Sequence, residues 1–249
     1  MAICMDRVLH KLDEYFARND TAAAGRHLDY WYEEALTEGN RRALFTLTNE
    51  LIGFHRKQGN REQALEYSRK IIALCRELEL EDTVSGATAF INAATACKAF
   101  GHAEEALPLF RKAKKVYEAR LEEDDPRLSG LYNNMGLALA DAGSFEEAKQ
   151  LYGKALMLTF NEEERKPDAA VTCLNMADAA EQEKGYAAAK TEIAELLQRA
   201  RNLLDSRRDS KDSYYAFVCE KCAPAFRYYG DAAYADELKE RSGKIYEGT

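Results

Sequence analysis

Two cysteines near the end of the chain, Cys219 and Cys222, have the C-x-x-C spacing that supports redox chemistry or zinc binding in other proteins. A zinc site also needs further Cys or His ligands at suitable spacing, and none accompanies this pair. Both cysteines fall on one face of a predicted helix, at positions where a helix needs buried residues. We therefore interpret them as packing residues and predict no metal and no cofactor.

Other residues that could do chemistry are scattered. His10, His27, His55 and His102 share no ligand partners, so we interpret them as structural or surface residues. The carboxylates of LEEDDP (121–126) and NEEERK (161–166) suit solvated loops and helix starts, where negative charge is stabilised by the helix dipole; an acid/base pair is the alternative. The sequence has no phosphate-binding glycine loop and no nucleophile elbow. We predict that the chain is not an enzyme.

Composition describes a helix-rich chain that can bury a large core. Hydrophobic residues make up 46% and charged residues 31% of 249 residues, with only 4 prolines. The net charge of −8 opposes broad attraction to phosphate backbones or anionic lipid, so no nucleic acid and no membrane partner is expected. Charged residues interrupt the first segment, where a signal peptide would be apolar, which predicts a cytoplasmic location.

A repeat settles the predicted architecture. Gly59, Gly101, Gly143 and Gly185 follow one another at a spacing of 42 residues. Five residues after the first three come the small residues Ala64, Ala106 and Ala148, whereas Ala189 takes this place one residue early in the fourth unit. A glycine can adopt the left-handed conformation that ends a helix, so each unit is predicted to be a helical hairpin. Gly136 and Ala177 in the first helices would let the two backbones approach closely.

Caps and helix breakers divide the chain into six units of one solenoid domain. Asp125 and Pro126 form a predicted N-cap and first helical position, and Pro167 repeats the pattern. Asn19 and Gly230 mark the turns of two degenerate outer units, and Pro224 is expected to kink or split the last first helix. The units are approximately 1–39, 40–81, 82–124, 125–166, 167–208 and 209–249, the outer two acting as caps.

The segment LYNNMGLALADAGSFEEAKQLYGKAL (131–156) resembles the tetratricopeptide repeat in its small, aromatic and glycine positions. The 42-residue length and the NNMG run are similar to kinesin-light-chain-type repeats of bacterial proteins. The resemblance implies an all-α fold, a right-handed α-α superhelix of about six antiparallel helix pairs. Its first helices line a concave groove, which is the natural binding surface of such solenoids.

A row of asparagines would face that groove. Asn92, Asn134 and Asn175 occupy equivalent places in consecutive units, with Asn133 one residue earlier. An amide carries both a donor and an acceptor and can bind the backbone of an extended peptide. The kinesin-light-chain resemblance implies that role here; the alternative is that the asparagines bond neighbouring helices and set their stacking. Further groove candidates are Thr95, Lys98, Arg56 and Lys57.

The predicted function is a protein-interaction scaffold or adaptor that binds a peptide or protein segment in the groove. A regulatory sensor that responds to a small peptide or metabolite is the alternative. An enzyme that uses the region from Cys219 to Tyr229 is the least favoured reading. The paired cations with which one subclass of the family clamps the C-terminal carboxylate of chaperones are missing at the equivalent sites.

Overall fold

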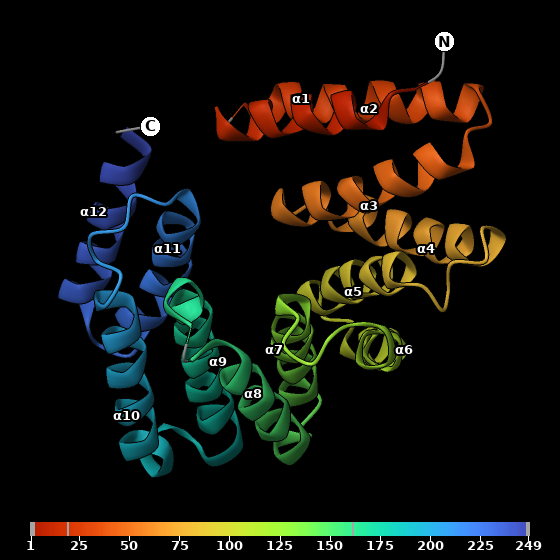
Figure 1. The fold of residues 1–249 in the computed structure, drawn as a ribbon. Coiled ribbons are helices and arrows are strands. Elements are labelled where there is room, and N and C mark those ends of the chain that lie inside the picture. Colours follow the sequence, from red (N-terminus) through yellow and green to blue (C-terminus); the bar gives the residue numbers. More distant parts are fainter. Residues whose placement is uncertain (1–2, 19, 161, 248–249) are drawn as a thin grey trace. The chain divides into compact units, whose positions relative to one another are not determined.

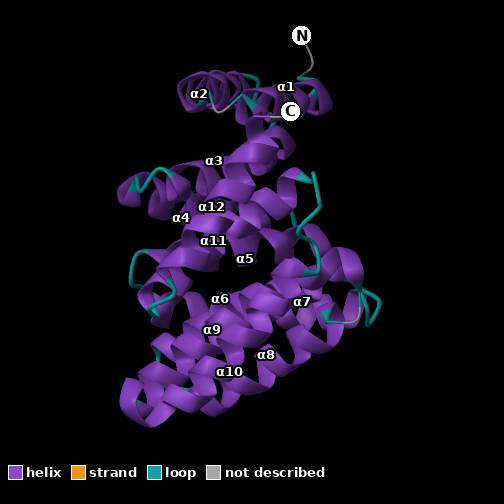
Figure 2. Cartoon of the chain, turned by 90° about the vertical axis from the view of Figure 1, so that its left-hand side faces the viewer, coloured by secondary structure: helices purple, strands orange, loops and turns teal. Residues whose placement is uncertain are grey.

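The computed structural model describes residues 3–18, 20–160 and 162–247, which form twelve α-helices and one short 3-10 helix (Figure 1). Figure 2 shows these helices joined by loops, with no strand among the described residues. The helices are α1 Met5–Ala17, α2 Thr21–Thr37, α3 Arg41–Lys57, α4 Arg61–Glu77, α5 Val84–Ala99, α6 Ala103–Arg120, α7 Pro126–Asp141, α8 Phe145–Thr159, α9 Lys166–Lys184, α10 Tyr186–Asp205, α11 Ser213–Tyr228 and α12 Ala232–Glu247, with the 3-10 helix at Glu163–Arg165.

The chain divides into two compact units, Met1–Leu121 (unit 1) and Glu122–Thr249 (unit 2). In unit 1 the packed pairs are α1 with α2, α3 with α4 and α5 with α6; in unit 2 they are α7 with α8, α9 with α10 and α11 with α12. First helices also touch within each unit, α3 against α5, α7 against α9 and α9 against α11. The architecture is therefore all-α and built from repeated helix pairs, as predicted from the sequence. That all six pairs form one domain stays a prediction.

Glycine turns join the helices of most pairs. Gly59 has φ +72°; its N–H donates to the Arg56 carbonyl, and the Asn60 N–H donates to the His55 carbonyl at 2.9 Å. These two bonds define the Schellman motif, in which a left-handed residue satisfies the last carbonyls of a helix. The same pair of bonds recurs at four other glycines: Gly39, Gly101, Gly143 and Gly230.

Gly185 works differently, although it keeps the 42-residue spacing. It ends α9 and directly precedes α10, with φ +77° and ψ 151°, so one residue serves as both C-cap and N-cap. After Gly143, by contrast, Ser144 is a separate N-cap. Gly185 is thus the structural counterpart of Ser144 rather than of Gly143, which explains why Ala189 follows it by four residues instead of five.

Small residues are buried in the paired helices. Ala64, Ala106 and Ala148 have no exposed surface, and Ala177 and Ala189 are buried. A Cβ added to Gly136 would lie 2.6 Å from Cε1 of Tyr152, which is itself fully buried. Contacts below 3.0 Å require a neighbour to shift, so this crossing of α7 and α8 needs a glycine.

The helix starts and prolines agree in part with the sequence predictions. The Asp125 carboxylate caps α7 by accepting the Arg127 N–H at 2.9 Å, and Pro126 is the first helical residue. Pro167 is the second residue of α9. A split at Pro224, one of the two outcomes expected there, is wrong because α11 runs unbroken through it, whereas a kink stays a prediction. Pro224 and Glu220, whose carbonyl loses a partner there, are both exposed, so water can satisfy the carbonyl. Asn19 lies outside the described residues.

A buried arginine ties the last three helices together. Arg241 on α12 donates to Tyr215 Oη at 3.1 Å, to Asp205 Oδ1 at 2.6 Å and to Glu237 Oε1 at 2.7 Å. Asp205 also accepts the Tyr234 hydroxyl at 2.8 Å. Because a buried guanidinium needs acceptors, these groups fix how α10, α11 and α12 meet.

Candidate functional site

Two adjoining cavities lie on the side of unit 2 formed by its first helices, α7, α9 and α11. The first cavity is about 240 Å³ and is lined in part by Asn133, Asn134, Asp168, Tyr214, Phe217 and Lys221. The second is about 400 Å³ and is lined in part by Leu174, Asn175, Asp178, Lys221, Tyr228 and Tyr229. Val171 and Lys221 line both cavities, so the two form one continuous surface, called here the α7/α9/α11 groove.

Amides link neighbouring repeats beneath this groove. Asn175 Nδ2 donates to Asn133 Oδ1 at 3.3 Å, and Asn133 Nδ2 donates to Thr172 Oγ1 at 2.8 Å. Asn133 is buried, so its amide is used between α7 and α9. Asn175 keeps one N–H and its carbonyl oxygen for other partners, since the bond to Asn133 uses a single donor.

The same amide pair occurs in unit 1. Asn92 Nδ2 on α5 donates to Asn49 Oδ1 on α3 at 3.0 Å. Each pair joins an asparagine of one repeat to an asparagine of the preceding repeat. The stacking role, which the sequence left as an alternative, is therefore present at Asn92, Asn133 and Asn175.

Asn134 differs from these three residues. It is half-buried and lines the first cavity, and its side-chain amide forms no hydrogen bond within the part of the chain that the structure describes. Its donors and its acceptor are thus all available. A ligand group that enters the first cavity can use them without breaking a bond inside the protein.

The exposed face of α11 carries an apolar stripe. Tyr214, Phe217 and Tyr228 are 45%, 47% and 69% exposed, and Lys221 and Pro224 are also exposed. These five residues follow a spacing of 3, 4, 3 and 4, which places them on one face of a helix at about 3.6 residues per turn. We call them the α11 stripe. Exposed aromatic side chains grouped beside a cavity are typical of a binding surface.

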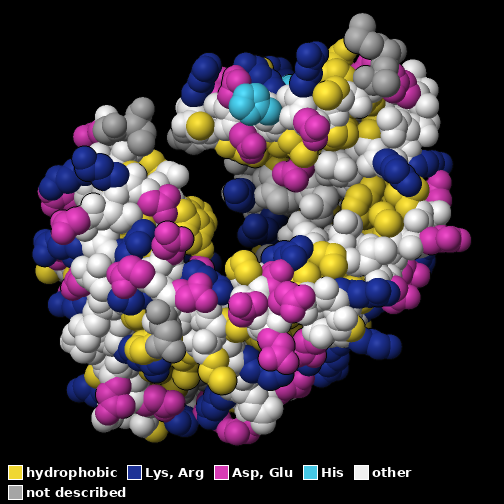
Figure 3. All heavy atoms as spheres, viewed as in Figure 1, with side chains coloured by type: hydrophobic (Ala, Val, Ile, Leu, Met, Phe, Trp, Pro, Cys, Tyr) yellow, Lys and Arg dark blue, Asp and Glu magenta, His cyan; other side chains and the backbone are white. Residues whose placement is uncertain are grey.

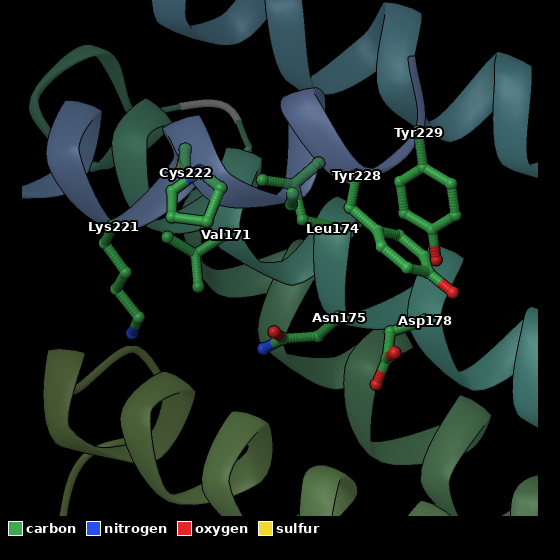
Figure 4. Close-up of a pocket in the computed structure, with 10 residues that line it drawn as sticks. Val171, Leu174, Asn175, Asp178, Lys221, Cys222, Tyr228 and Tyr229 are labelled. Carbon is green, nitrogen blue, oxygen red and sulfur yellow. The ribbon is translucent and has the colours of Figure 1, made fainter. Parts of the chain in front are cut away.

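The second cavity is polar at both ends. Figure 4 shows Lys221 at one end, Asp178 with Tyr228 and Tyr229 at the other, and the Asn175 amide between them. Leu174 and Val171 form part of the apolar lining. The cavity can therefore hold an apolar group while its ends recognise groups of opposite charge.

Hydrogen bonds hold the two tyrosines of the stripe in place. The Tyr214 hydroxyl donates to the Asp168 carboxylate, and the Tyr228 hydroxyl donates to Glu181 Oε1 at 3.0 Å. Burial, and then the Asp168 carboxylate, raise the pKa of the Tyr214 hydroxyl. The Glu181 carboxylate raises the pKa of Tyr228. Both phenols are therefore neutral donors near pH 7.

The other predicted groove residues lie on unit 1. Thr95 donates to the Ile91 carbonyl of its own helix at 2.7 Å, and Lys98 is half-buried. Burial lowers the pKa of the Arg56 guanidinium, and Lys57 Nζ lies 5.7 Å from the centroid of the Phe16 ring. The structure describes each unit by itself. A groove role for these residues, and for Asn92, stays a prediction.

The remaining reactive side chains occupy structural places. Cys219 and Cys222 are buried in the core of unit 2, where the packing interpretation puts them, and burial raises the pKa of the Cys222 thiol to about 12. The His27 ring bonds the Val8 carbonyl at 2.9 Å, and the His55 ring stacks on Tyr67. Among the described residues, no group of three or more His, Cys, Asp or Glu side chains could hold a metal ion.

Comparison with known families identifies the repeats. Two family models described as tetratricopeptide repeat match the chain, one over residues 43–119 and the other over residues 129–157. The chain contains tetratricopeptide repeats in both units. Tetratricopeptide-repeat proteins generally bind other proteins or peptides, so the fold is that of an interaction scaffold. Comparison with curated proteins gives no match.

Solved structures show the same fold. A putative kinesin light chain from Podosopora anserina with nearly identical TPR-like repeats matches with a TM-score of 0.55 and 19% identity, over 81% of this chain and 94% of that chain. BtubC (BKLC) from P. vanneervenii matches with a TM-score of 0.57 and 17% identity, over 93% and 91%. Aspartyl phosphate phosphatase F from Bacillus subtilis matches with a TM-score of 0.61 and 12% identity, over 98% and 61%. The fold is thus similar to that of kinesin-light-chain-like repeats, as predicted, whereas the bacterial type of the repeats stays a prediction.

The helices were compared with the requirements of a membrane span. Within residues 3–18, 20–160 and 162–247, no helix has both the length and the apolar character that a membrane span needs. Figure 3 shows acidic and basic side chains interspersed over the face of each unit that it displays. The charge of this tetratricopeptide-repeat protein is thus spread in small groups on that face.

Sequence reasoning missed the α11 stripe. The helix carries two apolar faces, a buried one with Tyr215, Cys219 and Cys222 and the exposed one with Phe217 and Tyr228. The signal was present as the spacing of 3, 4, 3 and 4 residues. One apolar face is enough to explain a packed helix, so this spacing does not by itself indicate a second, exposed face.

Proposed function

We propose that this tetratricopeptide-repeat protein is a scaffold that binds an extended peptide segment in the α7/α9/α11 groove. The segment lies across the two adjoining cavities and contacts α7 and α9 through its backbone. Its side chains rest on the α11 stripe, which extends about 21 Å at 1.5 Å per residue. That length accommodates about six residues of an extended chain.

The observation that carries the proposal is the free amide of Asn134 beside the exposed rings of the α11 stripe. An unpaired amide supplies a donor and an acceptor to a peptide group, and exposed aromatic rings supply apolar contact area. Asn175 adds its remaining N–H and carbonyl oxygen one repeat further along. Backbone bonds give affinity with little dependence on the ligand sequence, and the rings give preference for apolar side chains.

Peptides selected from a random library of acetylated, amidated 12-residue sequences test the proposal. Calorimetry on Asn134→Ala should show affinity weakened by about five-fold to a hundred-fold, because a peptide group loses its partner. Phe217→Ala should weaken the binding of the same peptides, because the rim of the first cavity loses an aromatic ring. Asn202→Ala is the matched control, since Asn202 is an exposed asparagine on α10 of the same unit. Selected peptides that bind Asn134→Ala and Phe217→Ala as tightly as wild type would refute the proposed site.

A further inference from the structure

One end of the second cavity is lined by the Asp178 carboxylate and by the rings of Tyr228 and Tyr229, and the Glu181 carboxylate is hydrogen-bonded to Tyr228. Asp178 and Glu181 are three residues apart on α9, and residues at that spacing share a helix face. Tyr228 comes from α11, and its hydroxyl donates to Glu181 Oε1 at 3.0 Å. Figure 4 shows Asp178 and Tyr228 at the same end of the cavity. We call this set of three residues the acidic end of the cavity.

The acidic end is not neutralised at Glu181. Glu181 is half-buried, and it forms no salt bridge with any described residue; the bond from Tyr228 is neutral. The nearby lysines pair with other carboxylates: Lys149 with Glu183 at 2.8 Å and Lys184 with Glu192 at 2.6 Å. A carboxylate held at the edge of an apolar cavity favours a positive group in its neighbourhood.

The aromatic rings suit a cation as well. Tyr228 is 69% exposed, and its ring meets that of Tyr229 edge to face at a centroid distance of 5.0 Å. Tyr229 stacks on Tyr186 at 6.4 Å, which supports it from behind. The open face of an aromatic ring attracts an ammonium or guanidinium group, and more strongly where carboxylates lie next to it.

We propose that the acidic end binds the side chain of an arginine or lysine from the bound segment, with the cation at Asp178 and Glu181 and against the Tyr228 ring. This inference rests on the proposed peptide-binding function. The aliphatic stem of the basic side chain lies on Leu174 and Ala225, which line the same cavity. Lys221 at the opposite end repels the cation, so the basic side chain enters the cavity with its charge at the acidic end and away from Lys221.

Selection of the random 12-residue library on wild type, followed by sequencing, tests the inference. Arginine or lysine should be enriched at one position of the selected peptides. In synthetic versions, replacing that arginine by citrulline, or that lysine by norleucine, should weaken binding to wild type by about tenfold or more, the range of a charge-assisted contact. For the double variant Asp178→Asn with Glu181→Gln, the same replacement in the peptide should weaken binding by about twofold or less. The reason is that the change in the peptide and the changes in the protein remove the same contact.

Two further variants control the test. Glu195→Gln removes one exposed carboxylate from α10 of the same unit and should behave as wild type. Tyr228→Leu keeps the carboxylates and removes the aromatic face, and it should reduce the preference for the basic residue. Circular dichroism on each variant confirms that the helices are intact.

The possible outcomes are distinct. Enrichment of a basic residue whose contribution disappears in the double variant supports the inference. Peptides that need Asn134 but show no basic preference, or whose preference survives in the double variant, overturn the inference and leave the proposed function standing. Peptides that bind independently of Asn134 and Phe217 contradict both.

Discussion

The ring of Tyr152 fills the space in which a side chain at position 136 would lie, 2.6 Å from the place of a Cβ on Gly136. Both residues are buried, so the contact fixes how closely α7 approaches α8. Gly136→Ala should therefore lower the free energy of unfolding by about 1 to 3 kcal/mol through overpacking, partly offset by the gain of about 1 kcal/mol in helix propensity. Urea unfolding monitored by circular dichroism measures the change.

Gly130→Ala is the control on the same helix. A Cβ added at Gly130 has no atom within 4 Å, so the substitution should raise the free energy of unfolding by about 0.5 to 1 kcal/mol. Equal effects of the two substitutions would show that the Tyr152 contact does not govern the crossing of α7 and α8.

The Arg241 network should stabilise the end of unit 2. Arg241→Met removes bonds to Tyr215, Asp205 and Glu237 and should cost about 1 to 3 kcal/mol, since charged hydrogen bonds are lost and their acceptors stay partly buried. Lys244→Met on the same helix removes an exposed ion pair with Glu240 and should change stability much less than Arg241→Met does. Chemical denaturation of the two variants gives the comparison. A larger loss for Lys244→Met would contradict the role assigned to Arg241.

The cap of α7 predicts a dependence on acid. The Arg127 side chain, together with its N–H, lowers the pKa of Asp125 from 3.8 to about 2. A group with a lowered folded-state pKa stabilises the fold above its ordinary pKa and loses that contribution as the pH falls through the folded value. Asp125→Asn keeps the cap acceptor but loses the charge, so it should be less stable than wild type by about 0.5 to 1 kcal/mol near pH 7. The difference should shrink between pH 4 and pH 2. A difference that stays constant over this range would mean that the Asp125 charge contributes nothing.

Cysteine labelling tests the core of both units. Cys4 is exposed, whereas Cys75, Cys97, Cys173, Cys219 and Cys222 are buried. Burial raises the pKa of Cys75 and Cys173 to about 11 and that of Cys222 to about 12, so these thiols are almost entirely protonated at pH 8. Iodoacetamide should modify one thiol per chain quickly, at Cys4, and the others only after unfolding. Mass spectrometry of the digested protein identifies the labelled sites; rapid modification of Cys219 or Cys222 would show that the pair is accessible.

Much of the fold could be predicted from the sequence because the repeat is defined by residues at positions with strong backbone or size requirements. Glycines at the turns and alanines at the helix crossings locate the hairpins, since few other residues fit those places. The role of Gly185 could not be predicted in this way. Spacing alone could not reveal that α9 and α10 share one cap residue, because a positive φ is compatible with either role.

The candidate site was predicted only in part. The asparagine positions were found from their spacing. The sequence could not distinguish Asn134, whose side-chain amide has no hydrogen bond among the described residues, from Asn175, whose side-chain amide donates to Asn133. The difference depends on whether the preceding repeat offers a polar partner in reach. The sensor alternative stays a prediction, and scattering with and without a bound peptide would test it.

Photocrosslinking at position 217 tests the central claim, that peptides bind in the α7/α9/α11 groove. Phe217 is replaced by a benzoyl-phenylalanine, which preserves an aromatic side chain, and Tyr246 on α12 receives the same residue as a control because it is similarly exposed. Illumination with a library-selected peptide should give a crosslink from position 217 and none from position 246. Retained binding with no crosslink from 217, or equal crosslinking from both positions, would contradict the claim.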